Sequence, residues 1–127
     1  MTEMRTPLRK ARGLGSARDG TMHFWRLRVS SVVLVPLSFF AVGLVLALFG
    51  QGYEATRATL GQPAVAILLA LFITISLEHM RLGMQEIIAD YIHSELLKVV
   101  LLMLNTVFSV LVGAASLFAL ARLAFGG

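Results

Sequence analysis

The chain alternates long apolar runs with short polar stretches, and three of the runs are long enough to cross a bilayer. They extend over about residues 29–49, 63–91 and 98–121. A helix of about 20 residues spans the hydrocarbon core of a membrane, which is ~30 Å thick. The pattern therefore predicts an all-α membrane protein with three transmembrane helices.

The polar stretches predict where these helices begin and end. Residues 1–28 are basic, and their glycines make helix unfavourable before about Thr21. Pro36 lies inside the first run, where we expect it to kink the helix, as membrane helices tolerate. Residues 51–62 are predicted to form a short polar loop, and residues 92–97 a tight connection.

The second run differs from the others because its second half is strongly polar. Its uncharged part ends at Leu77, but the helical pattern continues to Tyr91. A helix of about 29 residues is ~43 Å long, which exceeds the hydrocarbon core. We therefore expect this helix to tilt, or its polar end to stand in the membrane interface.

Composition supports a small membrane bundle and excludes several kinds of site. The 127 residues are 57% hydrophobic and only 14% charged, with a mean hydropathy of +0.83, whereas a soluble protein is about 25% charged. This length leaves no room for a separate soluble catalytic domain. Cysteine is absent, which excludes disulfides, thiolate metal ligands, iron–sulfur ligation and a cysteine nucleophile.

The net charge of +4 is concentrated at one end of the chain and concerns membrane orientation rather than nucleic acid. The flank before the first run carries seven basic residues: Arg5, Arg9, Lys10, Arg12, Arg18, Arg26 and Arg28. Because basic flanks stay inside, we expect a cytoplasmic N-terminus, Tyr91 near the cytoplasmic face and the 51–62 loop and C-terminus outside. The basic region is too long for a cleavable signal peptide; a mitochondrial presequence is the alternative.

Ionisable residues form two stripes on the polar half of the second run. On a 3.6-residue period, one stripe carries His79, Gly83, Glu86 and Asp90, and the other carries Glu78, Arg81 and Gln85. An ionisable group at membrane depth costs about 3 kcal/mol, so such residues usually serve a function. The first stripe is therefore the candidate site.

A haem is one ligand that fits this stripe. Imidazole is the commonest axial ligand of haem iron, and Gly83 clears a flat surface one turn after His79 for a bulky planar group. One histidine supplies one axial position, and neither His23 nor His93 lies at the same depth. A bis-histidine haem therefore requires a second chain, which predicts a hetero-oligomeric helix bundle.

The same residues have simpler explanations. A lone histidine in a membrane helix also serves as a hydrogen-bonding residue between helices, and Arg81 can pair with Glu78 or Gln85 or extend to the interface. Arg28 either pairs with a haem propionate or anchors the chain by its charge, as Arg26 equally does. The polar residues of the third run, Asn105, Ser109 and Ser116, are expected to serve helix packing.

These residues together resemble a known family. The pattern His79-x3-Gly83-Met84-x5-Asp90-Tyr91, in the second of three spans, resembles the small hydrophobic anchor subunit of succinate dehydrogenase, respiratory complex II. The likeness to alphaproteobacterial anchors extends to the opening Gly15-Ser16, Gly20-Thr21-x-His23-Phe24-Trp25 and Arg28. This resemblance covers the whole topology.

The resemblance implies roles for four residues. It makes His79 an axial ligand of haem b, with the opposite ligand on the larger anchor subunit. It makes Tyr91 a hydrogen-bond donor to a ubiquinone carbonyl, beside Asp90, and it places Arg28 near the haem propionates. His79 and Tyr91 are twelve residues apart, which corresponds to ~18 Å along a helix.

The resemblance also implies partners and a place in the cell. FAD and iron–sulfur clusters reside in a flavoprotein subunit and an iron–sulfur subunit, and a larger cytochrome b subunit completes the anchor. The complex passes electrons from succinate to ubiquinone, linking the tricarboxylic acid cycle to the respiratory chain. The chain itself is then an anchor subunit without a succinate-oxidising site, in a bacterial inner membrane or, alternatively, a mitochondrial one.

Two other functions compete with electron transfer. A small proton- or cation-conducting protein would use Glu78, His79, Glu86 and Asp90 as a relay, although this stripe covers only half of the span. A structural assembly factor would not require His79.

Overall fold

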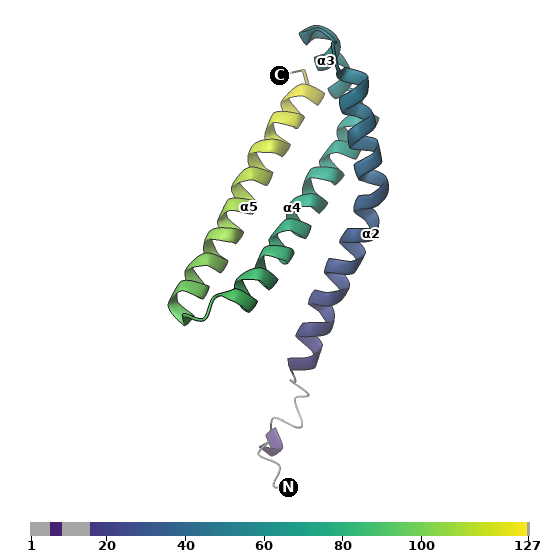
Figure 1. The fold of residues 1–127 in the computed structure, drawn as a ribbon. Helices are drawn as coiled ribbons and strands as arrows, with labels where there is room; N and C mark the ends of the chain where they lie inside the picture. The colour runs from purple at the N-terminus through teal and green to yellow at the C-terminus, as the bar shows by residue number, and fades with distance from the viewer. Residues whose placement is uncertain (1–5, 9–15, 127) are drawn as a thin grey trace.

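The computed structural model describes residues 6–8 and 16–126. Its helices are α2 (Ser16–Leu48), α3 (Tyr53–Leu60), α4 (Pro63–Tyr91) and α5 (Glu95–Ala124) (Figure 1). Three of them, α2, α4 and α5, are long and apolar enough to cross a membrane. The predicted all-α fold with three spans is therefore confirmed.

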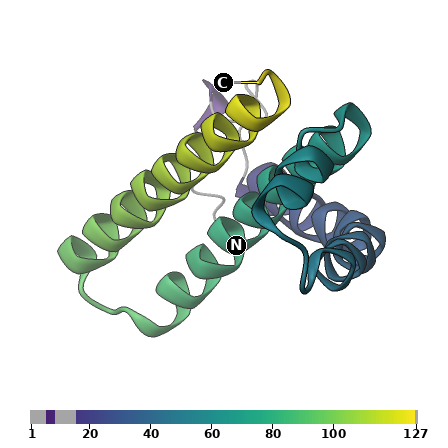
Figure 2. The ribbon, with the colours of Figure 1, turned by 90° about the horizontal axis from the view of Figure 1, so that it is seen from above.

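The middle span is also the middle helix in space. α4 packs against α2 on one side and α5 on the other, and it lies between them in both ribbon views (Figures 1 and 2). The start of α2 and the α4–α5 connection lie at one end of the molecule, whereas α3 and the end of α5 lie at the other (Figure 1). The polar half of α4 therefore lies beside the first turns of α2.

The prediction of a polar loop over residues 51–62 was wrong, because a short helix, α3, forms within it. Glu54 lies in the first turn of α3, where the helix dipole favours a negative charge. The helix ends at Gly61, whose N–H donates to the carbonyl of Arg57 at 3.0 Å. A β-carbon on Gly61 would lie 2.9 Å from the carbonyl oxygen of Leu123, so the end of α3 packs closely on α5.

Two of the long helices begin earlier than the sequence predicted. α2 starts at Ser16 rather than near Thr21 and continues as one helix through Pro36. α5 starts at Glu95, three residues before the predicted Lys98. Ser94 explains that start, because its hydroxyl caps the helix by accepting a hydrogen bond from the N–H of Leu97 at 3.5 Å.

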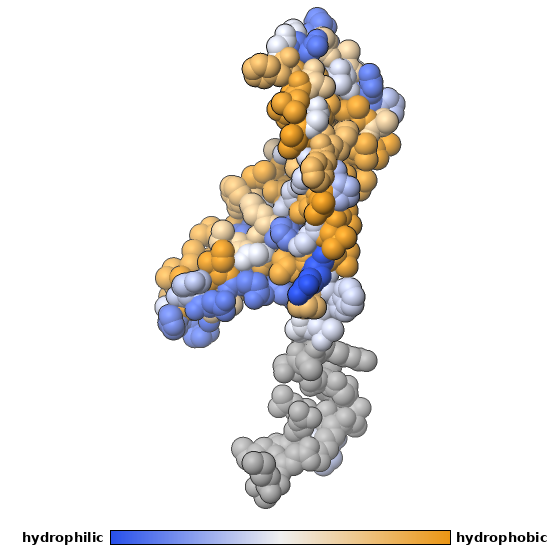
Figure 3. All heavy atoms as spheres, turned by 45° about the vertical axis from the view of Figure 1, so that its right-hand side comes forward, coloured by the Kyte–Doolittle hydropathy of each residue, from blue (hydrophilic) through white to orange (hydrophobic). Residues whose placement is uncertain are grey.

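Few side chains are buried within this single chain. The buried apolar residues of the described part are Leu37, Leu44, Ala66, Leu82, Ile88 and Leu120. Apolar side chains cover much of the visible face, and hydrophilic residues gather toward its ends (Figure 3). Lipid tails are as apolar as leucine, so close packing and polar contacts must hold these helices together.

Close packing is clearest between α4 and α5. A β-carbon on Gly113 would lie 3.1 Å from Cδ1 of Leu77, so the absence of a side chain lets the helices approach. Asn105 donates from Nδ2 to the carbonyl of Arg81 at 2.9 Å, across the same interface. The predicted packing role of Asn105 is confirmed, whereas Ser109 donates to the carbonyl of Asn105 within its own helix.

Leu82 is only 2% exposed and is the residue whose truncation should most weaken the bundle. We expect Leu82→Ala to lower the free energy of unfolding by about 2 kcal/mol, because it leaves a cavity in a close-packed interface. Reversible unfolding in mixed detergent micelles measures this change. Leu111→Ala, at an exposed position on α5, should change stability far less; equal effects would contradict the packing described here.

Candidate functional site

Three polar contacts join α2 to the polar half of α4. The Arg26 guanidinium pairs with Glu78, the Ser30 hydroxyl meets His79, and Nε2 of His23 lies 2.5 Å from Oε1 of Glu86. The three residues on α2 follow one another at i, i+3 and i+7, which places them on a single helix face. Because the helices are antiparallel, this face meets His79 and Glu86 of the first stripe, and Glu78 of the second, along about two turns of α4.

His79 is held by a hydrogen bond that assigns its ring nitrogens. Its Nδ1 lies 2.9 Å from Oγ of Ser30, and the same hydroxyl donates to the carbonyl of Leu27 at 2.8 Å. A hydroxyl has one hydrogen to donate, so we infer that Oγ accepts from a protonated Nδ1. The lone pair of the neutral imidazole then resides on Nε2, the nitrogen turned away from Ser30.

Open space adjoins Gly83, one turn further along α4. A β-carbon at this position would meet no atom within 4 Å, whereas one on Gly113 would press against α5. Close packing within this chain therefore accounts for the presence of glycine at position 113 but not at position 83. There is thus open space at Gly83, one turn from His79, while the predicted role of this space in holding a flat ligand stays a prediction.

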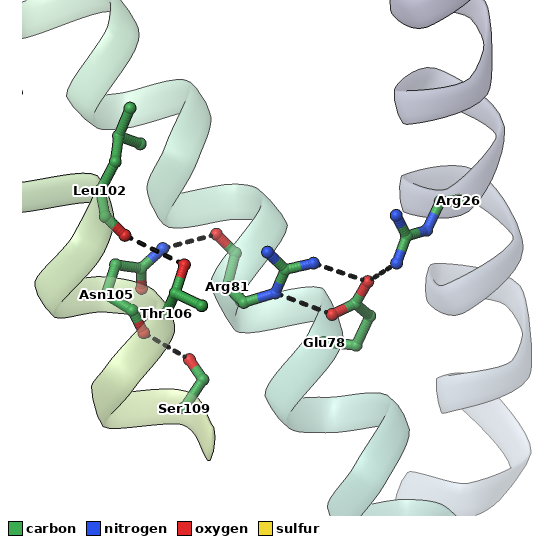
Figure 4. Close-up of polar contacts among 7 residues, drawn as sticks. All are labelled: Arg26, Glu78, Arg81, Leu102, Asn105, Thr106 and Ser109. Carbon is green, nitrogen blue, oxygen red and sulfur yellow. Dashed lines mark hydrogen bonds and ion pairs between the residues drawn. The ribbon is translucent and has the colours of Figure 1, made fainter. Parts of the chain in front are cut away.

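A network of two arginines and one glutamate crosses from α2 to α4 (Figure 4). Arg81 donates from Nε to one carboxylate oxygen of Glu78 at 2.9 Å and from Nη2 to the other at 3.0 Å. Arg26 reaches the second of these oxygens from α2. The predicted pairing of Arg81 with Glu78 is confirmed, but sequence reasoning missed the part that Arg26 has in it.

The other histidines lie apart from His79. His23 lies beside Glu86, and although Nε2 is buried and close to the carboxylate, it makes no hydrogen bond of regular geometry. His93 is exposed in the connection after α4. Within residues 6–8 and 16–126, no three His, Cys, Asp or Glu side chains gather as a metal site.

Tyr91 and Asp90 are both exposed at the end of α4. The side chain of Tyr91 is 74% exposed and lines the mouth of an apolar groove of about 360 Å³ between α4 and α5. The groove is bounded by Met84, Ile87, Ile88, Leu101, Leu104 and Phe108, among others. The chain alone therefore supplies one wall beside Tyr91 and leaves the other side open.

Arg28 is exposed and does not join the contacts between α2 and α4. Its guanidinium lies over the ring of Phe24, 4.9 Å from the centroid, in a cation–π contact within α2. It stands two residues before Ser30, which places it on a different face of the helix. Arg28 is thus available to an acidic group from outside this chain.

Comparison with known proteins agrees with the resemblance predicted from the sequence. Residues 2–119 match the model of the succinate dehydrogenase/fumarate reductase transmembrane subunit family. The chain belongs to this family. The predicted resemblance is therefore confirmed at the level of the family.

Relatives of the transmembrane subunit family cover nearly the whole chain. A protein of Paracoccus denitrificans is 35% identical over 95% of this chain and 93% of its own length. One of Rickettsia bellii is 31% identical over 86% of this chain and 87% of its own. Both are named succinate dehydrogenase hydrophobic membrane anchor subunit. No solved structure matches the chain.

The contact between Ser30 and His79 can be tested through the imidazole tautomer. We expect nitrogen NMR of the chain without cofactor to show His79 protonated on Nδ1, and Ser30→Ala to move part of the population to the Nε2 tautomer. Ser31→Ala is the matched control, because Ser31 also donates to the carbonyl of Leu27 but does not contact His79. An Nε2-protonated ring in the unaltered chain would contradict this geometry.

Proposed function

We propose that this chain is the membrane-anchor subunit of a succinate:ubiquinone oxidoreductase. In this proposal His79 is an axial ligand of haem b, and Tyr91 and Asp90 form part of the ubiquinone site. The observation that carries it is the Ser30–His79 hydrogen bond, which is made through Nδ1 and so leaves the other ring nitrogen, Nε2, for a metal. The names of the relatives in Paracoccus and Rickettsia support the anchor role.

The residues present fit a haem better than a metal ion held by protein ligands alone. His79 offers one nitrogen and stands outside any cluster of three ligands in the described part of the chain. A porphyrin brings four nitrogen ligands of its own, and the space beside Gly83 suits its flat ring. When bound, a haem supplies a one-electron redox centre. Ser30 fixes the tautomer and orientation of the ligating ring, as partners of metal-bound histidines generally do.

The second axial ligand belongs, in this proposal, to the larger cytochrome b anchor subunit. The imidazole of His23 contacts the carboxylate of Glu86, and His93 lies in the connection beyond Tyr91. A partner helix facing Gly83 would bring its own histidine to the opposite side of the ring. The exposed Arg28 guanidinium, at the same end of α2, would pair with a haem propionate at that interface.

Tyr91 is proposed to donate a hydrogen bond to a carbonyl oxygen of ubiquinone. A phenol stabilises negative charge that develops on this oxygen without adding a charge of its own. Exposure at the end of α4 permits partner chains to complete the site around the headgroup. In this proposal the chain lies in a bacterial inner membrane with its basic N-terminus on the cytoplasmic side. Tyr91 is then near the cytoplasmic face, where the iron–sulfur subunit, with the flavoprotein bound to it, would deliver electrons.

The ionic contacts count against the alternative of a proton or cation relay. Both carboxylate oxygens of Glu78 are engaged by arginines, and His79 is engaged by Ser30. A relay requires groups that exchange protons readily with their neighbours. Side chains held in ion pairs and hydrogen bonds to helix α2 are better suited to fixing a site.

His79→Ala should remove the b-type haem signal from the purified complex. The reduced-minus-oxidised spectrum measures this directly, and we expect the low-spin signal to be lost because one axial ligand is gone. His93→Ala, the matched histidine outside the bundle, should keep the spectrum. A haem signal that survives His79→Ala unchanged would remove the ligand assignment.

Tyr91→Phe should slow ubiquinone reduction and leave succinate oxidation intact. We expect kcat/KM for ubiquinone to fall about tenfold or more, because one hydrogen-bond donor to the reacting oxygen is lost. Succinate oxidation with a soluble artificial acceptor should be unchanged. Tyr53→Phe, an exposed tyrosine at the other end of the molecule, is the control. Full quinone reductase activity in Tyr91→Phe would exclude the proposed donor.

A further inference from the structure

A second open site lies where α2, α4 and α5 meet. It is a groove of about 520 Å³ with a charged end formed by Arg26, Glu78 and Arg81. The rest of its wall is mostly apolar and includes Leu77, Val110 and Ala114. The groove thus changes from charged to hydrocarbon character along its length.

The charged end carries more positive than negative charge. Among the described residues, the ion pairs of both Arg26 and Arg81 end on the single carboxylate of Glu78. Both oxygens of that carboxylate are already engaged, and the Arg26 side chain remains 54% exposed. Two guanidiniums against one carboxylate leave one positive charge that an anion from outside would balance.

The position of the charged end along the helices indicates that such an anion would come from the membrane lipids. Arg26 lies three residues before the uncharged run that starts at Val29, and Glu78 directly follows the uncharged run that ends at Leu77. Because Arg26 and Glu78 touch, both runs end at the same level. The uncharged parts of α2 and α4 end at this level, whereas α5, which meets Arg81 through Asn105, stays uncharged back to Val99. A long arginine side chain can extend from such a position toward the membrane interface, where lipid phosphates attract basic groups.

The groove lies on a different side of α4 from the proposed haem. Glu78 and Arg81 belong to the second stripe of α4, about 100° to 160° around the helix from His79. The α5 wall is shaped by Ala114 and by Gly113, which lets α5 approach Leu77. The groove is therefore separate from the face at Gly83.

We propose that this groove binds one anionic phospholipid. Its phosphate lies between Arg26 and Arg81, and one acyl chain follows the wall of Leu77, Val110 and Ala114. The excess positive charge selects the anionic headgroup, and the apolar continuation accepts the hydrocarbon chain. This assignment rests on the contacts of the chain itself and does not depend on the haem or quinone roles.

The test compares lipid binding by the intact complex and by two charge variants. The complex is purified with its accompanying subunits, and phosphatidylglycerol and phosphatidylcholine compete for it in detergent while native mass spectrometry counts retained lipids. We expect a preference for phosphatidylglycerol that falls about fivefold in Arg26→Gln. Lys98→Gln removes the same charge near the same membrane face but outside the groove, and it should keep the preference.

A second pair of variants tests the acyl-chain part of the groove. Ala114→Phe fills the wall and should lower phosphatidylglycerol retention, whereas Ala115→Phe, on another face of α5, should not. Equal losses of preference in Arg26→Gln and Lys98→Gln would reduce the effect to general charge attraction and overturn the site. An Ala114→Phe complex that assembles and keeps full phosphatidylglycerol retention would show that no acyl chain follows this wall and would overturn the site. Failure of Ala114→Phe to assemble, while Ala115→Phe assembles normally, would mean that a partner helix occupies the groove and would overturn it as well.

Discussion

The row of polar contacts between α2 and α4 is the interaction on which this structure depends. In a bilayer, apolar surfaces gain little by leaving lipid, so polar contacts and close packing set how helices associate. One ion pair and one hydrogen bond fix how α4 is rotated about its axis and shifted along it relative to α2. They join Arg26 to Glu78 and Ser30 to His79. That placement decides which side of His79 is occupied by this chain and which side remains open.

The contacts with α2 and with α5 involve different faces of α4. The face toward α2 holds His79 in one orientation, and the face toward α5 is held by Asn105 and by the close approach at Gly113. On the same stripe as His79, Gly83 leaves space, because a β-carbon there would meet no atom within 4 Å. This combination would suit the haem sharing proposed above, because an axial ligand must be held rigidly while the space beside it stays accessible.

The sequence predicted the three spans correctly, since they follow from local runs of apolar residues. It also singled out His79 from a local pattern of ionisable residues, and the role of this histidine stays a prediction. It missed α3, because a short polar helix resembles a polar loop in composition. It also missed Ser30, which contacts His79, and gave Arg26 only a role in membrane orientation, although Arg26 pairs with Glu78. Their partners lie about fifty positions away in the sequence, and one sequence carries no signal for which face of α2 meets α4.

The open space at Gly83 and the exposure of Tyr91 are likewise properties of the folded chain. Glycine inside a membrane helix usually indicates close packing, as at Gly113, and only the packed structure distinguishes the two positions. Tyr91 at a helix end has the same sequence pattern whether it anchors the helix in the interface or binds a ligand. The resemblance of the stretch from His79 to Tyr91 to succinate dehydrogenase anchors is the basis for proposing the second interpretation.

An experimental structure of the assembled complex with its cofactor bound would test the proposed haem ligand. We expect iron bonded to Nε2 of His79, Nδ1 still within hydrogen-bonding distance of Ser30, and the porphyrin packed beside Gly83. Iron bonded through Nδ1, or a His79 ring that contacts only lipid or another helix, would contradict it.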